Sequence, residues 1–175
     1  MKNTKKLLIN KHCITILIII PLLLCSCGYQ MVSEKGLYGG DIMSLYVPVF
    51  KNNTYEPHAS MYVTDAFTRE IVLSGLFKVN IQNPDAYING KITQITINPA
   101  TMNASGIVVE KTISASIEVS MYKNSGGLLK NWSFSDSETY NVVDINSEDF
   151  NKRDALKRLS GRMARKFCSI ILVDY

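Results

Sequence analysis

Two cysteines at the end of an apolar run are the residues best suited to covalent chemistry in this sequence. Cys25 and Cys27 stand in the stretch LLLCSCGYQ, residues 22–30. As a pair they could form a redox couple or half of a metal site, or they could simply fill an apolar segment. However, Leu24 lies three residues before Cys27 and the small Ser26 lies immediately before it, a pattern typical of a cysteine that is acylated during signal cleavage. We therefore predict that Cys27 becomes the first residue of the mature chain, thioether-linked to a diacylglycerol and N-acylated.

The residues before Cys27 have the layout of a secretory signal peptide, with a basic start followed by a short apolar segment. The apolar segment, residues 13–24, is interrupted only by Thr15 and Pro21. A helix that spans a bilayer needs about 18 to 20 apolar residues, so this segment is too short for a permanent span. An ordinary secretory signal with an incidental cysteine is the other alternative. We predict a lipoprotein signal peptide over residues 1–26 and a lipidated tether over residues 27–41.

Signal cleavage changes the charge balance of the chain. The sequence has 19 basic and 15 acidic residues, and four of the lysines but none of the acids precede Cys27. The net charge therefore falls from +4 to zero in the mature chain, which removes any argument for a nucleic-acid partner. Gly28 follows Cys27, where an aspartate would retain a lipoprotein at the inner membrane. These features predict a lipid-anchored protein of the outer membrane of a Gram-negative bacterium.

The mature chain offers few side chains for catalysis. Its one histidine, His58, is expected at an exposed helix start, and Cys168 is expected to be a buried, inert thiol. A catalytic triad, a Cys–His pair or a paired-histidine metal site would need further residues of these types. We therefore predict a non-enzyme that needs no metal or cofactor, although the scattered carboxylates leave a carboxylate hydrolase open.

The hydrophobic periodicity predicts the elements that would position these residues. Alternation with a period of two favours strands at residues 41–50, 77–81, 87–97 and 112–122, and another strand after a turn at residues 124–127. Helical periodicity favours helices at residues 58–74 and 147–172, with Pro57 at the first helical position and Gly75 as the stop. Gly90 indicates a bulge or a close approach within its strand. Residues 99–110 fit either a loop or an extension of the two strands that they join.

These elements predict an α+β fold, a two-layer sandwich that forms one domain over residues 42–175. A mostly antiparallel sheet of about four to five strands would be covered by two helices. The last helix has a continuous apolar stripe that would face the sheet. The stripe consists of Leu156, Leu159, Met163, Phe167 and Ile170.

The last helix also carries an excess of positive charge. Seven basic residues lie between positions 152 and 166. One interpretation is a solvated helix face with some contacts to the acidic remainder of the domain. The other is a docking face for an anionic partner, such as lipid phosphates, a polyanionic glycolipid or an acidic protein wall. For that second role the candidate residues are Arg158, Arg162 and Arg165.

Three stretches of the mature chain resemble the lipopolysaccharide-assembly lipoprotein family, LptE. They are CGY at residues 27–29, LYVPVFKNNTYEP at residues 45–57 and DAYINGKI at residues 85–92. The resemblance implies a lipoprotein that plugs the lumen of a large outer-membrane β-barrel, LptD, assists its assembly, and binds lipopolysaccharide on its way to the outer leaflet. Family members are credited with basic glycolipid contacts near strand-connecting loops, whereas residues 101–109 hold no basic residue here. Cys27 is therefore the one functional residue that the resemblance supplies.

Another class of outer-membrane lipoprotein begins with a similar strand and Asn-Thr turn. Such a protein would dock a periplasmic enzyme or a secretion apparatus, as a regulator of a peptidoglycan synthase or a CsgG-like or TolB-N-terminal-like accessory domain would. The barrel plug is our prediction, and this docking function is the alternative.

Overall fold

The computed structural model describes residues 42–142 and 144–173 of the chain. The predicted signal peptide, residues 1–26, and the tether with its Cys27, residues 27–41, lie outside the described residues. Within the described part of the chain, no helix is both long and apolar enough to cross a membrane.

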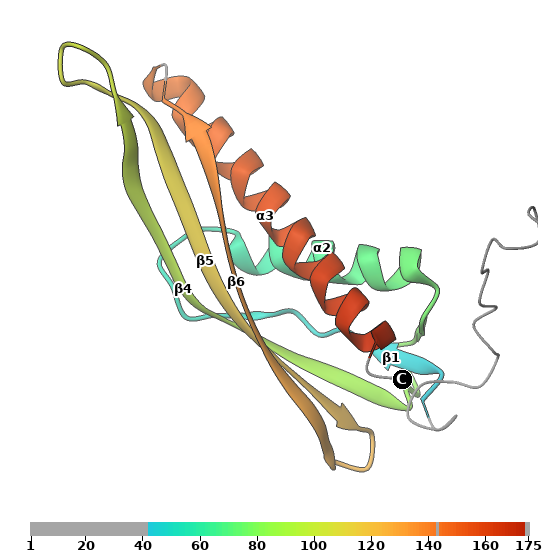
Figure 1. Cartoon of the computed structure of the whole chain (residues 1–175). Coiled ribbons are helices and arrows are strands. Elements are labelled where there is room, and N and C mark those ends of the chain that lie inside the picture. The colour runs from blue at the N-terminus through green and yellow to red at the C-terminus, as the bar shows by residue number, and fades with distance from the viewer. Residues whose placement is uncertain (1–41, 143, 174–175) are drawn as a thin grey trace, which may run out of the picture. The chain divides into compact units, whose positions relative to one another are not determined.

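The described residues form a sheet that is covered on one face by two helices (Figure 1). Three long strands, β4 (Ala86–Met102), β5 (Val108–Lys123) and β6 (Leu128–Asn141), pair antiparallel in that order. There are also three short strands, β1 (Ser44–Tyr46), β2 (Lys51–Asn52) and β3 (Lys78–Val79). β1 and β2 pair parallel with β4, and β3 pairs parallel with β1. The helices are α2 (Ala59–Ser74) and α3 (Ile145–Val173). The predicted α+β sandwich is therefore confirmed, with strand order β3-β1-β4-β5-β6 and β2 also paired to β4.

The hydrophobic core lies between the sheet and the helices. β5 supplies every second residue to it. Its buried members are Ile113, Ala115, Ile117, Val119 and Met121. The stripe on α3 is confirmed at Leu156, Leu159, Met163 and Phe167. In the next turn Ile171 is buried and Ile170 is only partly buried, because α3 is also covered on the side of Cys168, which lies close to Ser74 of α2.

Gly90 marks a close approach of the backbone and not a bulge. It pairs in register with Val119 of β5, and the register shift comes later, between Ile92 and Gln94. A Cβ atom at Gly90 would overlap the ring of Phe50, which is buried in the core. The glycine therefore leaves room for an aromatic core residue.

The segment that the periodicity leaves open, residues 99–110, extends β4 and β5 into a long hairpin. The side-chain oxygen of Asn103 closes its turn by accepting hydrogen bonds from the backbone N–H groups of Ser105 and Ile107. Pro99 is tolerated because β1 and β2 pair with β4 only at residues 86–87 and 91–92, so Pro99 lies on an edge where no donor is needed.

α2 begins at Ala59, so the prediction that Pro57 occupies the first helical position is wrong. Asn52 explains the later start. Its side chain accepts hydrogen bonds from the N–H and hydroxyl of Thr54 and donates one to the carbonyl of Glu56, which holds the chain in a turn up to that residue. His58 then takes a left-handed conformation, with φ of 61°, and is exposed at the helix start as predicted. The predicted stop at Gly75 is confirmed.

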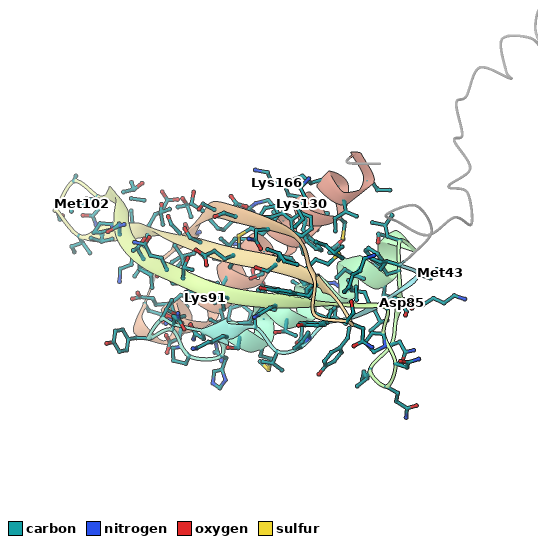
Figure 2. All side chains as sticks on the ribbon, turned by 90° about the horizontal axis from the view of Figure 1, so that it is seen from below. Met43, Asp85, Lys91, Met102, Lys130 and Lys166 are labelled. Carbon is teal, nitrogen blue, oxygen red and sulfur yellow. The ribbon has the colours of Figure 1, made fainter. Side chains whose placement is uncertain are left out.

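Asp85 fixes the short strand β1 to the turn before β4. Its carboxylate accepts hydrogen bonds from the backbone N–H groups of Met43 and Ser44, at 3.0 and 2.8 Å, and from the Ser44 hydroxyl at 2.8 Å. These hydrogen bonds, with that of the Ser44 side chain the strongest influence, hold the pKa of Asp85 below its usual value. Figure 2 shows Met43 and Asp85 together at one end of the sheet and Met102, at the start of the hairpin turn, at the other end.

Candidate functional site

The sheet face opposite the helices, which we call the outer sheet face, is rich in hydroxyl and amide side chains. The alternation that buries the odd-numbered residues of β5 turns its even-numbered residues outward, together with the residues that pair with them. Across this face the hydroxyls of Ser116 and Ser135 lie 2.8 Å apart, and those of Thr112 and Thr139 lie 3.0 Å apart. The members are Thr112, Ser114, Ser116, Glu118, Ser120 and Tyr122 of β5, Asn131, Ser133, Ser135, Ser137 and Thr139 of β6, and Tyr87, Asn89, Lys91, Gln94, Thr96 and Asn98 of β4.

The outer sheet face carries little charge. Its one pair of opposite charges consists of Lys91 and Glu118, which are directly opposite on β4 and β5 with 4.0 Å between the ammonium nitrogen and a carboxylate oxygen. Glu110 of β5 also faces this side, and its carboxylate accepts a hydrogen bond from the Thr101 hydroxyl at 2.6 Å. Tyr87 and Tyr122 stack at one end of the face, with ring centroids 5.3 Å apart. Hydroxyl and amide groups can donate as well as accept, so this face can bind a polar surface directly or through water.

The helix face that was predicted to dock an anionic partner lies against the edge strand β6. Arg162 donates hydrogen bonds to Asp136 at 2.7 Å, to Glu138 at 2.5 Å and to the carbonyl of Ser137 at 2.8 Å. Arg158 donates to Glu138 at 2.7 Å and to Asp154 on its own helix. These contacts join α3 to β6 through a network of charge-assisted hydrogen bonds.

The same network changes the titration of its acids. Burial alone would raise the pKa values of Asp136 and Glu138. The hydrogen bonds and positive charges of Arg162, with those of Arg158 at Glu138, outweigh that effect and hold both pKa values below their usual range. Both acids therefore stay ionised at neutral pH and keep their arginine partners.

The third candidate, Arg165, forms a separate ion pair with Glu70 of α2 at 3.3 Å. All three predicted docking arginines thus have a carboxylate partner within the domain. These ion pairs agree with the first interpretation of the basic helix face, in which it contacts acidic residues of the same domain. Each arginine remains partly exposed. A role of Arg158, Arg162 and Arg165 in docking an anionic partner therefore stays a prediction.

His58 and Cys168, the histidine and the thiol considered for catalysis in the sequence, lie far apart. Cys168 contacts Ser74 at one end of α2, whereas His58 precedes the other end. A helix of 16 residues is about 24 Å long, so the two side chains cannot act together. Cys168 is buried, as predicted, and burial raises the pKa of its thiol to about 11. Among the described residues, no group of three or more His, Cys, Asp or Glu side chains could hold a metal ion.

The outer sheet face is the feature that the sequence interpretation did not identify. A signal for it is present in the sequence, because alternate residues of the segments 112–122 and 131–139 are Ser, Thr or Asn at nearly every position. That alternation predicts which residues face away from the core. It does not by itself distinguish a binding face from an ordinary solvated one.

The family comparison covers almost the whole described domain. The model of the LptE family, described as lipopolysaccharide-assembly, matches residues 42–169. No curated protein matches the sequence. A minor lipoprotein from Acinetobacter baumannii has a similar structure, with a TM-score of 0.52 and 9% identity over 76% of this chain and 92% of that chain. A protein from Xanthomonas campestris gives a TM-score of 0.54 and 10% identity over 77% of this chain and 87% of its own.

The two structural matches, at such low identity, show a shared fold, and the family match adds the relationship in sequence. It confirms the resemblance found in the stretches at residues 45–57 and 85–92. Since residues 42–169 make up well over half of the sequence, the chain belongs to the LptE family of lipopolysaccharide-assembly proteins.

Proposed function

We propose that this protein is a lipid-anchored outer-membrane lipoprotein that plugs a β-barrel lipopolysaccharide translocon of the LptD type and assists its assembly. In this role it supports the insertion of lipopolysaccharide into the outer leaflet without catalysing a reaction. Membership of the LptE family supports lipopolysaccharide assembly as the process. Acylated Cys27 would be the membrane anchor, and the barrel and lipopolysaccharide would be the partners.

The observation that carries the proposed plug function is the outer sheet face. The lumen of a large outer-membrane barrel is lined by polar side chains and water. A plug with many unpaired charges would need a matching charge for each one on the wall, because a desolvated charge without a partner is costly. The hydroxyls and amides of the outer sheet face have no such requirement, and its charged pair, Lys91 and Glu118, is complementary within the face.

The direct test is to isolate the acylated protein from membranes in mild detergent and to identify what is recovered with it. The proposal expects a large β-barrel in equal amount. Recovery of a periplasmic synthase or a secretion component without a barrel would instead support the docking alternative and would refute the plug.

A charge on the outer sheet face tests its part in this contact. We expect Ser133→Arg to lower recovery of the barrel by about tenfold or more, because the new guanidinium would be desolvated against a wall without a matching acid. The Ser133 side chain is exposed on the edge strand β6, so the fold should tolerate an arginine there. The matched control is Ser125→Arg in the exposed β5–β6 turn, which should leave recovery unchanged. Equal recovery with both variants would remove the outer sheet face from the proposed contact.

The anchor is tested by Cys27→Ala. This variant should lose labelling by radioactive palmitate and should keep its signal peptide, because lipoprotein processing needs the thiol. Cys25→Ala is the control and should be processed normally, since Cys25 lies within the predicted signal peptide. Normal palmitate labelling of Cys27→Ala would refute the assignment of Cys27 and would point to Cys25.

A further inference from the structure

Exposed apolar side chains gather at the end of the sandwich where β1 lies. We call this set the apolar end patch, and its members are Met43, Val72, Leu73, Val79, Ile81 and Leu172. Leu73 and Ile81 are 71% and 73% exposed. Single exposed apolar residues are common on protein surfaces, but a contiguous group of them marks an interaction site.

The members come from four segments that contact one another. Val79 pairs with Leu45 on β1, and the N–H of Lys78 donates to the carbonyl of Met43 at 2.9 Å. Val72 and Leu73 are in the last turn of α2, which contacts β3. Leu172 lies one turn beyond Cys168, which lies close to Ser74 at the end of α2. Phe77 and Ile171 are buried directly beside these members in the chain, so the patch is the place where the core reaches the surface.

We propose that the apolar end patch inserts into the boundary between headgroups and acyl chains of the membrane that holds the lipid anchor. The inference rests on the proposed acylation of Cys27. Residues 28–41 separate Cys27 from Ile42, the first described residue, and a chain of that length spans at most about 50 Å. Since Ile42 adjoins Met43 of the patch, the tether holds this end of the domain within reach of the bilayer.

A basic side chain on β3, beside the patch, suits a membrane surface. Lys78 is exposed and stands next to the exposed Val79. Its ammonium group can therefore contact lipid phosphates while the side chain of Val79 contacts acyl chains. The nearby carboxylate of Asp85 is engaged by three hydrogen bonds from Met43 and Ser44. The acyl chains on Cys27 supply the affinity for the membrane, and the patch fixes which end of the domain faces it.

Site-directed spin labelling of the mature, acylated protein measures this insertion. Leu73→Cys and Ile81→Cys each provide one label position, and Ile107→Cys in the β4–β5 turn is the matched control because Ile107 is 62% exposed at the opposite end. Cys168 should not take up the label, because its thiol is buried and protonated near neutral pH. The labelled proteins are reconstituted in vesicles of phosphatidylethanolamine and phosphatidylglycerol without any partner protein.

The labels at positions 73 and 81 should collide several-fold more often with oxygen, and several-fold less often with a water-soluble nickel chelate, than the label at position 107. Equal nickel accessibility at all three positions would overturn the proposal. Shielding that arises only after a β-barrel partner is added would also overturn it, because the patch would then be a protein interface. The mass of the intact protein reports acylation in the same sample, so a negative result is distinguishable from loss of the anchor.

A charged variant separates insertion from mere proximity to the vesicle. Leu73→Asp in the Ile81→Cys background keeps the acylated Cys27 and should stay with the vesicles on flotation. Its label at position 81 should nevertheless regain full accessibility to the nickel chelate, because a carboxylate in the patch opposes entry into the acyl region. If the label stayed shielded, insertion through the patch would be refuted.

Discussion

Replacing Gly90 with alanine is expected to lower the free energy of unfolding by about 2 kcal/mol, although it adds only one methyl group. The new Cβ would overlap the ring of Phe50, which is only 1% exposed. The ring has little room to move away, because the ring centroid of Phe67 lies 4.8 Å from that of Phe50. Phe67 in turn packs against Phe167, with ring centroids 5.4 Å apart. Urea unfolding followed by circular dichroism measures the change.

Two comparisons connect that loss to the Phe50 ring. Gly127→Ala is the control, since a Cβ there meets nothing within 4 Å, and it should change the free energy of unfolding by less than about 0.5 kcal/mol. Phe50→Leu destabilises by itself but makes space, so its combination with Gly90→Ala should cost about 1 kcal/mol less than the sum of the single changes. Additive effects would mean that the strain at Gly90 arises from some other contact.

The parts of the fold that the sequence predicts well are those with one buried and one exposed side. β5 alternates apolar and polar residues over most of its length, and α3 repeats apolar residues at steps of three and four, so the core-facing side of each is read directly from the residue order. Gly90 is predicted in part, because a glycine within a strand indicates either a bulge or a close approach. Only the structure shows that the ring of Phe50 lies over it.

Other features depend on contacts between residues far apart in sequence. Residues 97–102 of β4 are exposed on both faces, so no alternation marks the hairpin extension that they form. The short strands β1 and β3 contain only three and two residues, and they are held by pairing with each other and by Asp85, about 40 positions from Ser44. Local propensity contains no information about such pairings.

The same limit applies to the candidate site. The basic residues of α3 are visible in the sequence, but their partners on β6 are 20 or more positions away. Without those partners the face is equally consistent with an anion-docking surface. The outer sheet face could be deduced from alternation, since its Ser and Thr residues occupy the positions between buried ones. Its value as a contact surface depends on a sheet face that the two helices leave open.

Replacing Arg162 with glutamine is expected to lower the free energy of unfolding at pH 7 by about 1.5 kcal/mol. That value lies between the small effect of an exposed ion pair and the larger effect of breaking a buried one, because the Arg162 side chain is 38% exposed while Asp136 and Glu138 are 29% and 21% exposed. Arg153→Gln removes the same charge from the same helix and is the control. Within the described part of the chain, Arg153 donates a hydrogen bond to the carbonyl of Asp149 on its own helix, so this change should cost less than about 0.5 kcal/mol.

The pH dependence of that difference tests whether Arg162 stabilises the domain through its charge. Because the folded pKa values of Asp136 and Glu138 are lowered, the stability that they contribute is fully present above their unfolded values, about 4, and is lost as the pH falls through the folded values. In the variant, Glu138 keeps Arg158, but burial acts on Asp136 with much less opposition and raises its pKa. The variant therefore loses less stability in acid than the wild type does. The difference between their free energies of unfolding should shrink as the pH falls from 7 to about 3. A difference that stays constant over this range would mean that Arg162 stabilises the domain through the packing of its aliphatic stem and not through its charge.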